Sequence, residues 1–338
     1  MNNAQAAVKL PTFSSQTADA PRHEFSSALA LCALLCFCVL PGGQGQQAPG
    51  PQTTIRKQVD LVLVDVIVTD PKGTIVSGLR AKDFEIQDEG APQEVVHLSQ
   101  DEIPLAIALV VDVSGSMGPI MKLMKDALVH ALPALRAEDR VALFSFADRS
   151  FLELGLTSDF SKVAKRIRGL GDGELTNVND AVYNAADYLR KRDPSGRRVI
   201  ILMSDGRGNT GSASAEEVER QLVGSEVALF AIGVPVTVPP ELRYPRSVIV
   251  DRLAEESGGF MVIVHRLDGF RTAFESLIQI LKSRYTLGFY PNTAGKPGSV
   301  RHLTVRLKNR GVEEALPNVM LRYRKQYVVP RDKTQKSR

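Results

Sequence analysis

Five uninterrupted apolar runs, separated by segments with helical periodicity, constrain the fold of this chain more than any other feature. The runs cover residues 105–111, 141–146, 199–203, 227–234 and 260–264. Strands that are apolar at every position, rather than at every second one, are typical of parallel strands buried on both faces. Segments with helical length and pattern lie at 120–136, 160–168, 179–192, 215–223, 248–256 and 268–282. This alternation predicts an α/β fold with a doubly wound, mostly parallel sheet.

The segments on either side of this central region have strand periodicity instead. The expected strands are 59–68, 83–87 and 93–99 before it, and 285–290, 302–308 and 318–329 after it. Each flank has about 45 residues, which is small for an independent core, but the two together approach the size of one immunoglobulin-type sandwich. We therefore expect an α/β domain at 103–283 that is flanked by, or inserted into, a β-sandwich made from segments 58–102 and 284–329.

The amino-terminal region carries all three cysteines, Cys32, Cys36 and Cys38, inside one apolar run at 28–40. At about 13 residues this run is short for a membrane span, and small residues follow it, as in an export signal. We predict a signal peptide at 1–45 and a linker at 46–57, which leaves a secreted or periplasmic protein with no transmembrane span and no cysteine. The alternative is an uncleaved signal anchor that tethers the protein to the membrane. A basic tail, 330–338, ends the chain.

Composition narrows the choice of partner. Forty-two lysines and arginines against 38 aspartates and glutamates give a net charge of +4. This is too small for a protein whose main task is to bind the phosphate backbone of a nucleic acid. A hydrophobic content of 43% argues against wholesale disorder and against a multi-span membrane protein. We therefore expect a globular chain that does not bind nucleic acid.

Five oxygen-bearing side chains stand where parallel strands end or helices begin. Asp112, Ser114 and Ser116 follow the first apolar run, Thr176 precedes the 179–192 helix, and Asp205 follows the 199–203 run. Each of these could singly be a helix cap or a turn residue. In an α/β sheet, however, loops at the carboxyl ends of strands converge and form the ligand site. Taken together, the five residues lie on three loops that can converge on one polar site.

At these residues the sequence resembles the von Willebrand factor type A domain family, over about 103–283, with its Rossmann-like fold and its metal-ion-dependent adhesion site. The resemblance implies that Ser114 and Ser116 bind Mg²⁺ directly and that Thr176 binds directly or through water. It implies that Asp112 and Asp205 act mainly through water. Segments 66–70 and 285–291 extend the likeness to bacterial, notably acidobacterial, secreted "VWFA-related" proteins.

The chemistry of these ligands is consistent with a binding device. Mg²⁺ prefers hard oxygen ligands in octahedral geometry and keeps several waters, with Mn²⁺ and Ca²⁺ as alternatives. Hydroxyl ligands carry no formal charge, so the cation stays electrophilic and can accept a carboxylate from outside. We therefore expect a protein partner that presents an Asp or Glu. The expected contact rim comprises Gly118, Arg149, Glu174, Arg207 and Asn209.

Two other functions compete with a binding module. An enzyme is disfavoured because Ser114 lacks the Gly-x-Ser-x-Gly context of α/β hydrolases and the chain has no Gly-x-x-x-x-Gly-Lys-Ser/Thr string. We therefore predict no catalytic residue. The second is a structural or assembly component of the cell envelope in which the metal only staples the loops together.

Overall fold

The computed structural model describes residues 61–100, 103–193, 196–205, 211–233, 248–264, 269–291, 296–308 and 318–329. The chain divides into two units, Met1–Arg56 and Lys57–Arg338, and the described residues all belong to the second. The predicted signal peptide, linker and basic tail lie outside the described residues. Among the helices that the structure describes, none is long and apolar enough to cross a membrane.

The central part of the second unit is a six-stranded sheet with the strand order β10-β9-β8-β5-β6-β7. Its strands are β5 (Leu105–Asp112), β6 (Arg140–Phe146), β7 (Ser150–Thr157), β8 (Arg197–Ser204), β9 (Val227–Gly233) and β10 (Met261–Ile263). All neighbours are parallel except β7, which pairs antiparallel with β6. The predicted fold class is confirmed, because the five continuous apolar runs form the five parallel strands.

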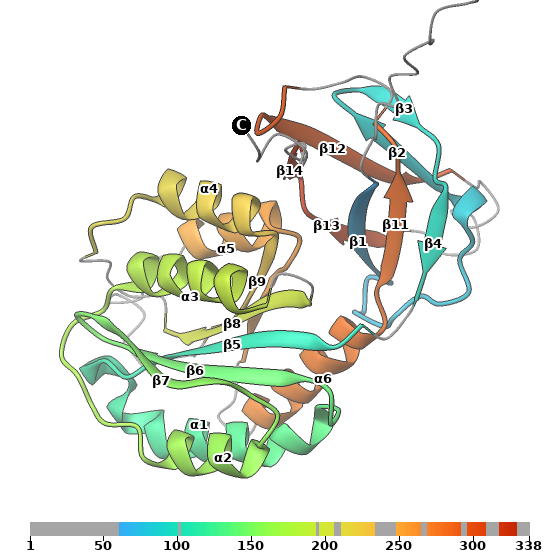
Figure 1. Ribbon diagram of the computed structural model, residues 1–338. Coiled ribbons are helices and arrows are strands. Elements are labelled where there is room, and N and C mark those ends of the chain that lie inside the picture. Colours follow the sequence, from blue (N-terminus) through green and yellow to red (C-terminus); the bar gives the residue numbers. More distant parts are fainter. Residues whose placement is uncertain are drawn as a thin grey trace, which may run out of the picture. The chain divides into compact units, whose positions relative to one another are not determined.

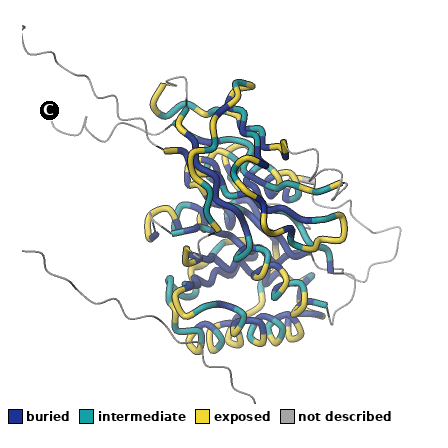
Figure 2. Tube along the Cα trace, turned by 90° about the vertical axis from the view of Figure 1, so that its right-hand side faces the viewer, coloured by how far each residue is buried: buried dark blue, intermediate teal, exposed yellow. Residues whose placement is uncertain are grey.

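Helices cover both faces of this sheet (Figure 1). One face is covered by α1 (Gly118–Ala131), α2 (Phe160–Arg168) and α6 (Phe270–Lys282), and the other by α3 (Val178–Arg192), α4 (Ala215–Ser225) and α5 (Val248–Glu256). The buried residues of β5 alternate between the two hydrophobic clusters, with Leu109 on the first face and Ala108 on the second. Exposed residues lie on the outer sides of the helices, whereas the inner strands β5, β6, β8 and β9 are largely buried (Figure 2). The sheet is therefore the centre of the hydrophobic core.

The two flanks form two four-stranded antiparallel sheets, with the orders β13-β1-β11-β4 and β14-β12-β2-β3. The strands are β1 (Val62–Thr69), β2 (Phe84–Asp88), β3 (Ala91–Gln93), β4 (His97–Ser99), β11 (Tyr285–Phe289), β12 (Val300–Leu307), β13 (Met320–Tyr323) and β14 (Gln326–Val328). Strand β1 pairs with β11 and β13, and β2 pairs with β12, so strands from before and after the α/β region share both sheets. Their inner faces share one hydrophobic cluster. The residue boundaries of the domains stay predictions.

For two segments of the flanks, the prediction of one continuous strand was wrong. The segments 93–99 and 318–329 were each expected to be a single strand, but the first contains the end of β3 and all of β4, the second contains β13 and β14, and in each case the two strands belong to different sheets. Residues 94–96 separate β3 from β4, and Arg324 and Lys325 separate β13 from β14. Strands that change sheets at a bend are a known way of making the corners of a sandwich. A period-two pattern reports which side chains face inward, but it does not report the sheet to which a residue belongs.

Asp65 of β1 connects the sandwich to the central sheet. Its carboxylate accepts a hydrogen bond from Thr286 Oγ1 at 2.7 Å and lies 3.2 Å from Arg284 Nη1. It also lies 3.6 Å from Nη2 of Arg197, the first residue of β8. Burial by itself raises the pKa of Asp65, but Arg284, Arg197 and the Thr286 hydroxyl together hold it below its ordinary value. The folded chain therefore favours the ionised carboxylate.

We predict that Asp65→Asn lowers the free energy of unfolding by about 2 kcal/mol at neutral pH, as expected when hydrogen bonds to charged groups are lost. Because the pKa of Asp65 is lower in the folded chain than in the unfolded chain, the carboxylate stabilises the fold above the unfolded pKa. That contribution is lost as the pH falls through the folded pKa. The stability difference between wild type and variant, measured by urea denaturation, should be constant above about pH 5 and shrink below about pH 4.

The matched control is Asp187→Asn, because Asp187 forms ion pairs with Arg190 and Lys191 on the surface of α3. Exposed pairs of this kind contribute less than about 1 kcal/mol. A stability loss for Asp65→Asn as small as that of the control, or one that persisted undiminished in acid, would contradict this role of Asp65.

Candidate functional site

The site begins at the carboxyl end of the central strand β5. Asp112 is the last residue of this strand and its side chain is fully buried. Its carboxylate accepts hydrogen bonds from the backbone N–H of Ser114 at 3.0 Å and from the hydroxyl of Ser204 at 2.6 Å. Ser204 is the last residue of the neighbouring strand β8. Two adjacent strand ends thus fix the orientation of this carboxylate.

The two serines predicted as metal ligands lie side by side in the turn that follows. Ser114 Oγ is 3.1 Å from Ser116 Oγ. Adjacent oxygen ligands of an octahedral Mg²⁺ are separated by about 3 Å, given metal–oxygen distances of about 2.1 Å. Ser114 is buried and Ser116 is partly exposed. The pair therefore has the spacing of neighbouring ligands, and one of its members faces solvent.

The loop that carries Thr176 is held against this turn. The backbone N–H of Gly173 donates a hydrogen bond to the carbonyl oxygen of Val113 at 2.7 Å. A β-carbon at position 173 would lie 2.3 Å from the β-carbon of Ala147, so the close approach of the loop requires glycine. Thr176 is buried and precedes Asn177, whose side chain caps the amino terminus of α3 by accepting from the N–H of Asp180.

Asp205 follows β8 directly and is partly buried. Burial raises the pKa of Asp112, hydrogen bonds from Ser114 and Ser204 lower it, and the negative charge of Asp205 raises it, with a net pKa of about 6. The two carboxylates therefore interact unfavourably when both are ionised. A bound cation would relieve this repulsion, because opposite charge favours the ionised form.

The expected rim residues are placed as follows. Gly118 is the first residue of α1, Arg149 lies in the turn between β6 and β7, and Glu174 lies in the loop before α3. All three are exposed. Arg207 and Asn209 lie outside the described residues.

Sequence reasoning missed the role of Ser204. The signal that could have found it is a polar residue at the end of an otherwise apolar strand, directly before Asp205. It also missed Asp180, which accepts hydrogen bonds from the backbone N–H groups of Ser212 and Ala213 and so ties α3 to the segment after β8. Its signal was an acidic residue in the first turn of a helix.

The donor set fits a hard divalent cation. The residues concerned offer hydroxyl and carboxylate oxygens, which Mg²⁺ prefers over nitrogen and sulfur. Within the described ranges, no group of three or more His, Cys, Asp and Glu side chains could hold a metal. The serine pair supplies two hydroxyl oxygens of the kind that a hard cation accepts.

Comparison with known proteins agrees with this architecture. Residues 107–207 match the family model for the von Willebrand factor type A domain. The pig inter-alpha-trypsin inhibitor heavy chain H2 is 32% identical over 151 residues, which is 40% of this chain and 16% of the relative. The human H2 chain is 30% identical over 149 residues, with the same coverage. The chain thus spans about a sixth of the length of these curated relatives.

Two solved structures show a weaker likeness. A von Willebrand factor type A protein from Catenulispora acidiphila has a TM-score of 0.46, 13% identity and 78% coverage of both chains. Proximal thread matrix protein 1 from the mussel byssus, described with a zinc-occupied MIDAS motif, has a TM-score of 0.46 and 21% identity, covering 59% of this chain and 50% of its own.

The parallel sheet with helices on both faces and a polar site at its carboxyl edge defines an α/β domain of the doubly wound class. Residues 107–207 match the family model, so the chain contains a von Willebrand factor type A domain. Its membership of the bacterial "VWFA-related" group stays a prediction.

We predict that Gly173→Ala weakens binding of Mn²⁺ about tenfold, because displacing a supporting element of a metal site typically costs that much affinity. The added methyl group would collide with Ala147 and push the loop away from Val113. Gly171→Ala is the matched control, since a β-carbon at position 171 would meet nothing within 4 Å. Titration calorimetry with MnCl₂ measures both variants, and equal affinities for the two would show that the loop does not support the site.

Proposed function

We propose that this chain is an exported, metal-dependent protein-binding module of the adhesion type. In this proposal a divalent cation, Mg²⁺ or alternatively Mn²⁺ or Ca²⁺, is held by Ser114 and Ser116, with Thr176, Asp112 and Asp205 completing the site. The partner is a protein that presents an Asp or Glu side chain. The proposal requires no catalytic residue.

The spacing of the serine pair carries the proposal. Two hydroxyl oxygens 3.1 Å apart, which is hydrogen-bond distance, also have the separation of adjacent ligands on one octahedral cation. Asp112 lies directly behind them and is oriented by two hydrogen bonds. It could therefore hold a metal-bound water without leaving its place.

The surroundings of the pair support access from outside. Ser116, Gly115, Gly118 and Glu174 are partly or fully exposed around the two oxygens and the adjacent loop. The serine hydroxyls are uncharged, so as direct ligands they do not reduce the charge of the cation. The only negative charges in the proposed site are those of its two carboxylates, which together equal the charge of a divalent cation. The cation would supply an electrophilic position that attracts a partner's carboxylate.

The proposed location is outside the cytoplasm, either secreted or periplasmic, with tethering by an uncleaved signal anchor as the alternative. The support for this is the apolar run at 28–40.

The alternative function is a structural component of the envelope in which the metal only holds the loops together. The burial of Ser114 and Thr176 favours that alternative, because a closed set of ligands offers no exchangeable position.

We predict that Ser114→Ala lowers the affinity for Mn²⁺ at least about tenfold, since it removes one ligand from the cation. Ser161→Ala is the control, because Ser161 lies exposed on α2. Titration calorimetry on the full chain measures both. Unchanged affinity in Ser114→Ala would contradict the proposed ligand set.

A second measurement separates the two functions. With Mn²⁺ bound, water-proton relaxation reports the exchangeable waters on the ion, and acetate serves as a probe for a partner's carboxylate. For a binding module, acetate displaces water and lowers the relaxation enhancement, while chelation changes the melting temperature little. If acetate has no effect and chelation lowers the melting temperature by several degrees, the metal is a structural staple and the binding function is wrong.

A further inference from the structure

A second polar centre lies at the opposite edge of the central sheet, where its strands begin. A pocket of about 310 Å³ is lined by residues of β1, the starts of β8 and β9, the end of α4 and the strands β11 and β14. Its volume corresponds to about ten water molecules at about 30 Å³ each, so it can admit a small ion. None of the residues proposed for the metal lines it.

The charged side chains that line this pocket are unbalanced. They are four arginines and two carboxylates, namely Arg197, Arg198, Arg284, Arg324, Asp65 and Glu226. Their formal charges leave an excess of two positive charges. Arginines this well buried are normally paired with as many anions, because uncompensated buried charge is unfavourable.

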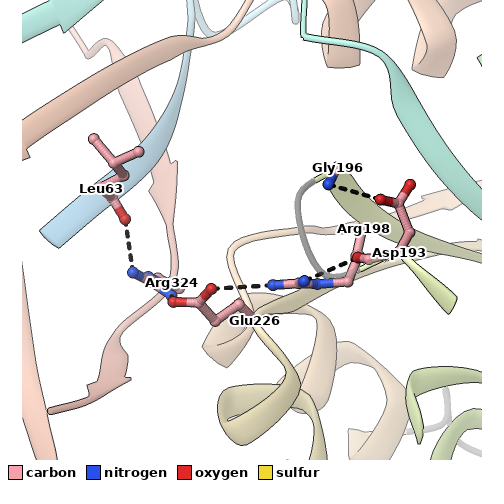
Figure 3. A network of polar contacts seen from close by, with 6 residues as sticks. All are labelled: Leu63, Asp193, Gly196, Arg198, Glu226 and Arg324. Atoms are coloured by element: carbon pink, nitrogen blue, oxygen red, sulfur yellow. Dashed lines mark hydrogen bonds and ion pairs between the residues drawn. The ribbon is translucent and has the colours of Figure 1, made fainter. Parts of the chain in front are cut away.

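Each carboxylate is already shared between arginines. Glu226 lies between two of them, accepting from Arg198 at 3.0 Å and from Arg324 at 2.9 Å, while Arg324 also donates to the carbonyl oxygen of Leu63 at 2.6 Å (Figure 3). Asp65 is shared between Arg284 and Arg197. The two carboxylates therefore form ion pairs with all four arginines.

Arg284 is the least satisfied of the four. It is 3% exposed and reaches Asp65 through Nη1 only. Its Nε and Nη2 are buried, as is Nε of Arg324, and no residue in the described part of the chain accepts a hydrogen bond from these nitrogens. An Nε and an Nη of one guanidinium form the planar fork that binds two oxygens of a carboxylate or phosphate.

The electrostatics of Arg284 agree with this geometry. Burial lowers the pKa of Arg284, Asp65 raises it and the nearby Arg197 lowers it, with a net pKa of about 10. The chain's own anion thus does not offset the burial of this cation. An additional anion in the pocket would do so.

We propose that this pocket binds a small oxyanion, a phosphate or a carboxylate, through the guanidinium groups of Arg284 and Arg324. The site is independent of the metal-dependent function proposed above. The anion would contact residues of the sandwich and of the α/β region at once, so it would strengthen the contact between them. Cations are repelled by the excess positive charge, and the depth of Arg284 and Arg197 favours a free ion over one carried on a large surface.

The test is titration calorimetry of the full chain with inorganic phosphate and, separately, with acetate, in chloride buffer at constant ionic strength. We expect at least one of the two to bind with a dissociation constant on the order of 1 mM or below. The anion that binds more tightly identifies the preferred chemistry. If neither binds more tightly than chloride, the proposal is wrong.

Three variants are expected to change anion binding in different ways. Arg324→Gln should weaken binding about tenfold, because it removes a charged hydrogen-bond donor. Glu226→Gln should strengthen binding several-fold, because it removes a competing anion and frees Arg198 and Arg324. Arg190→Gln, which changes an exposed arginine paired with Asp187, should leave binding unchanged.

The opposite effects of Arg324→Gln and Glu226→Gln distinguish a binding site from a purely structural cluster. A structural cluster would be destabilised by both changes, and neither would improve anion binding. Weaker binding in Glu226→Gln, or an equal loss in Arg190→Gln, would overturn the proposal. Melting curves of each variant show that it is folded before it is titrated.

Discussion

The complete burial of strand β5 is the constraint on which the rest of the structure depends. All eight of its residues are buried, and it pairs along its length with β6 on one side and β8 on the other. A strand enclosed in this way has no freedom to shift its register without exposing one apolar face. The position of Asp112 at its end is therefore fixed by hydrophobic packing. This explains how a carboxylate whose ionised form is disfavoured by burial is nonetheless held in place.

The same packing bears on the ligands of the proposed metal site. The carboxyl edge of the sheet is closed by apolar residues such as Val113 and Met117, and Met117 is fully buried. Several carboxylates in such surroundings would raise one another's pKa and remain protonated. Serine hydroxyls have no charge to bury and still offer oxygen to a hard cation. A hydroxyl-rich ligand set is thus the arrangement that this environment tolerates best.

The central sheet could be predicted from the sequence, and Asp112 and Asp205 lie at strand ends as expected, because apolar runs and polar strand ends are local signals. Ser204 could not be assigned a role, since its partner Asp112 lies 92 residues away and only the pairing of β5 with β8 brings them together. The bends at 94–96 and at Arg324 were missed for a similar reason, because a change of sheet leaves the alternation intact. The arginine pocket has no local pattern at all: Asp65, Arg197 and Arg284 meet only through the tertiary fold.

Strand β8 runs from one polar centre to the other, with Arg197 at its start and Ser204 at its end. Its length separates them by roughly 23 Å at about 3.3 Å per residue. Seven of its eight residues, all except Arg198, are buried, and the strand lies between β5 and β9, so it offers no second arrangement through which one end could affect the other. Energetic effects at sites this far apart with no shared partner are usually additive. The carboxyl edge and the arginine pocket therefore act independently, and a change that alters both would have to act on the stability of the sheet itself.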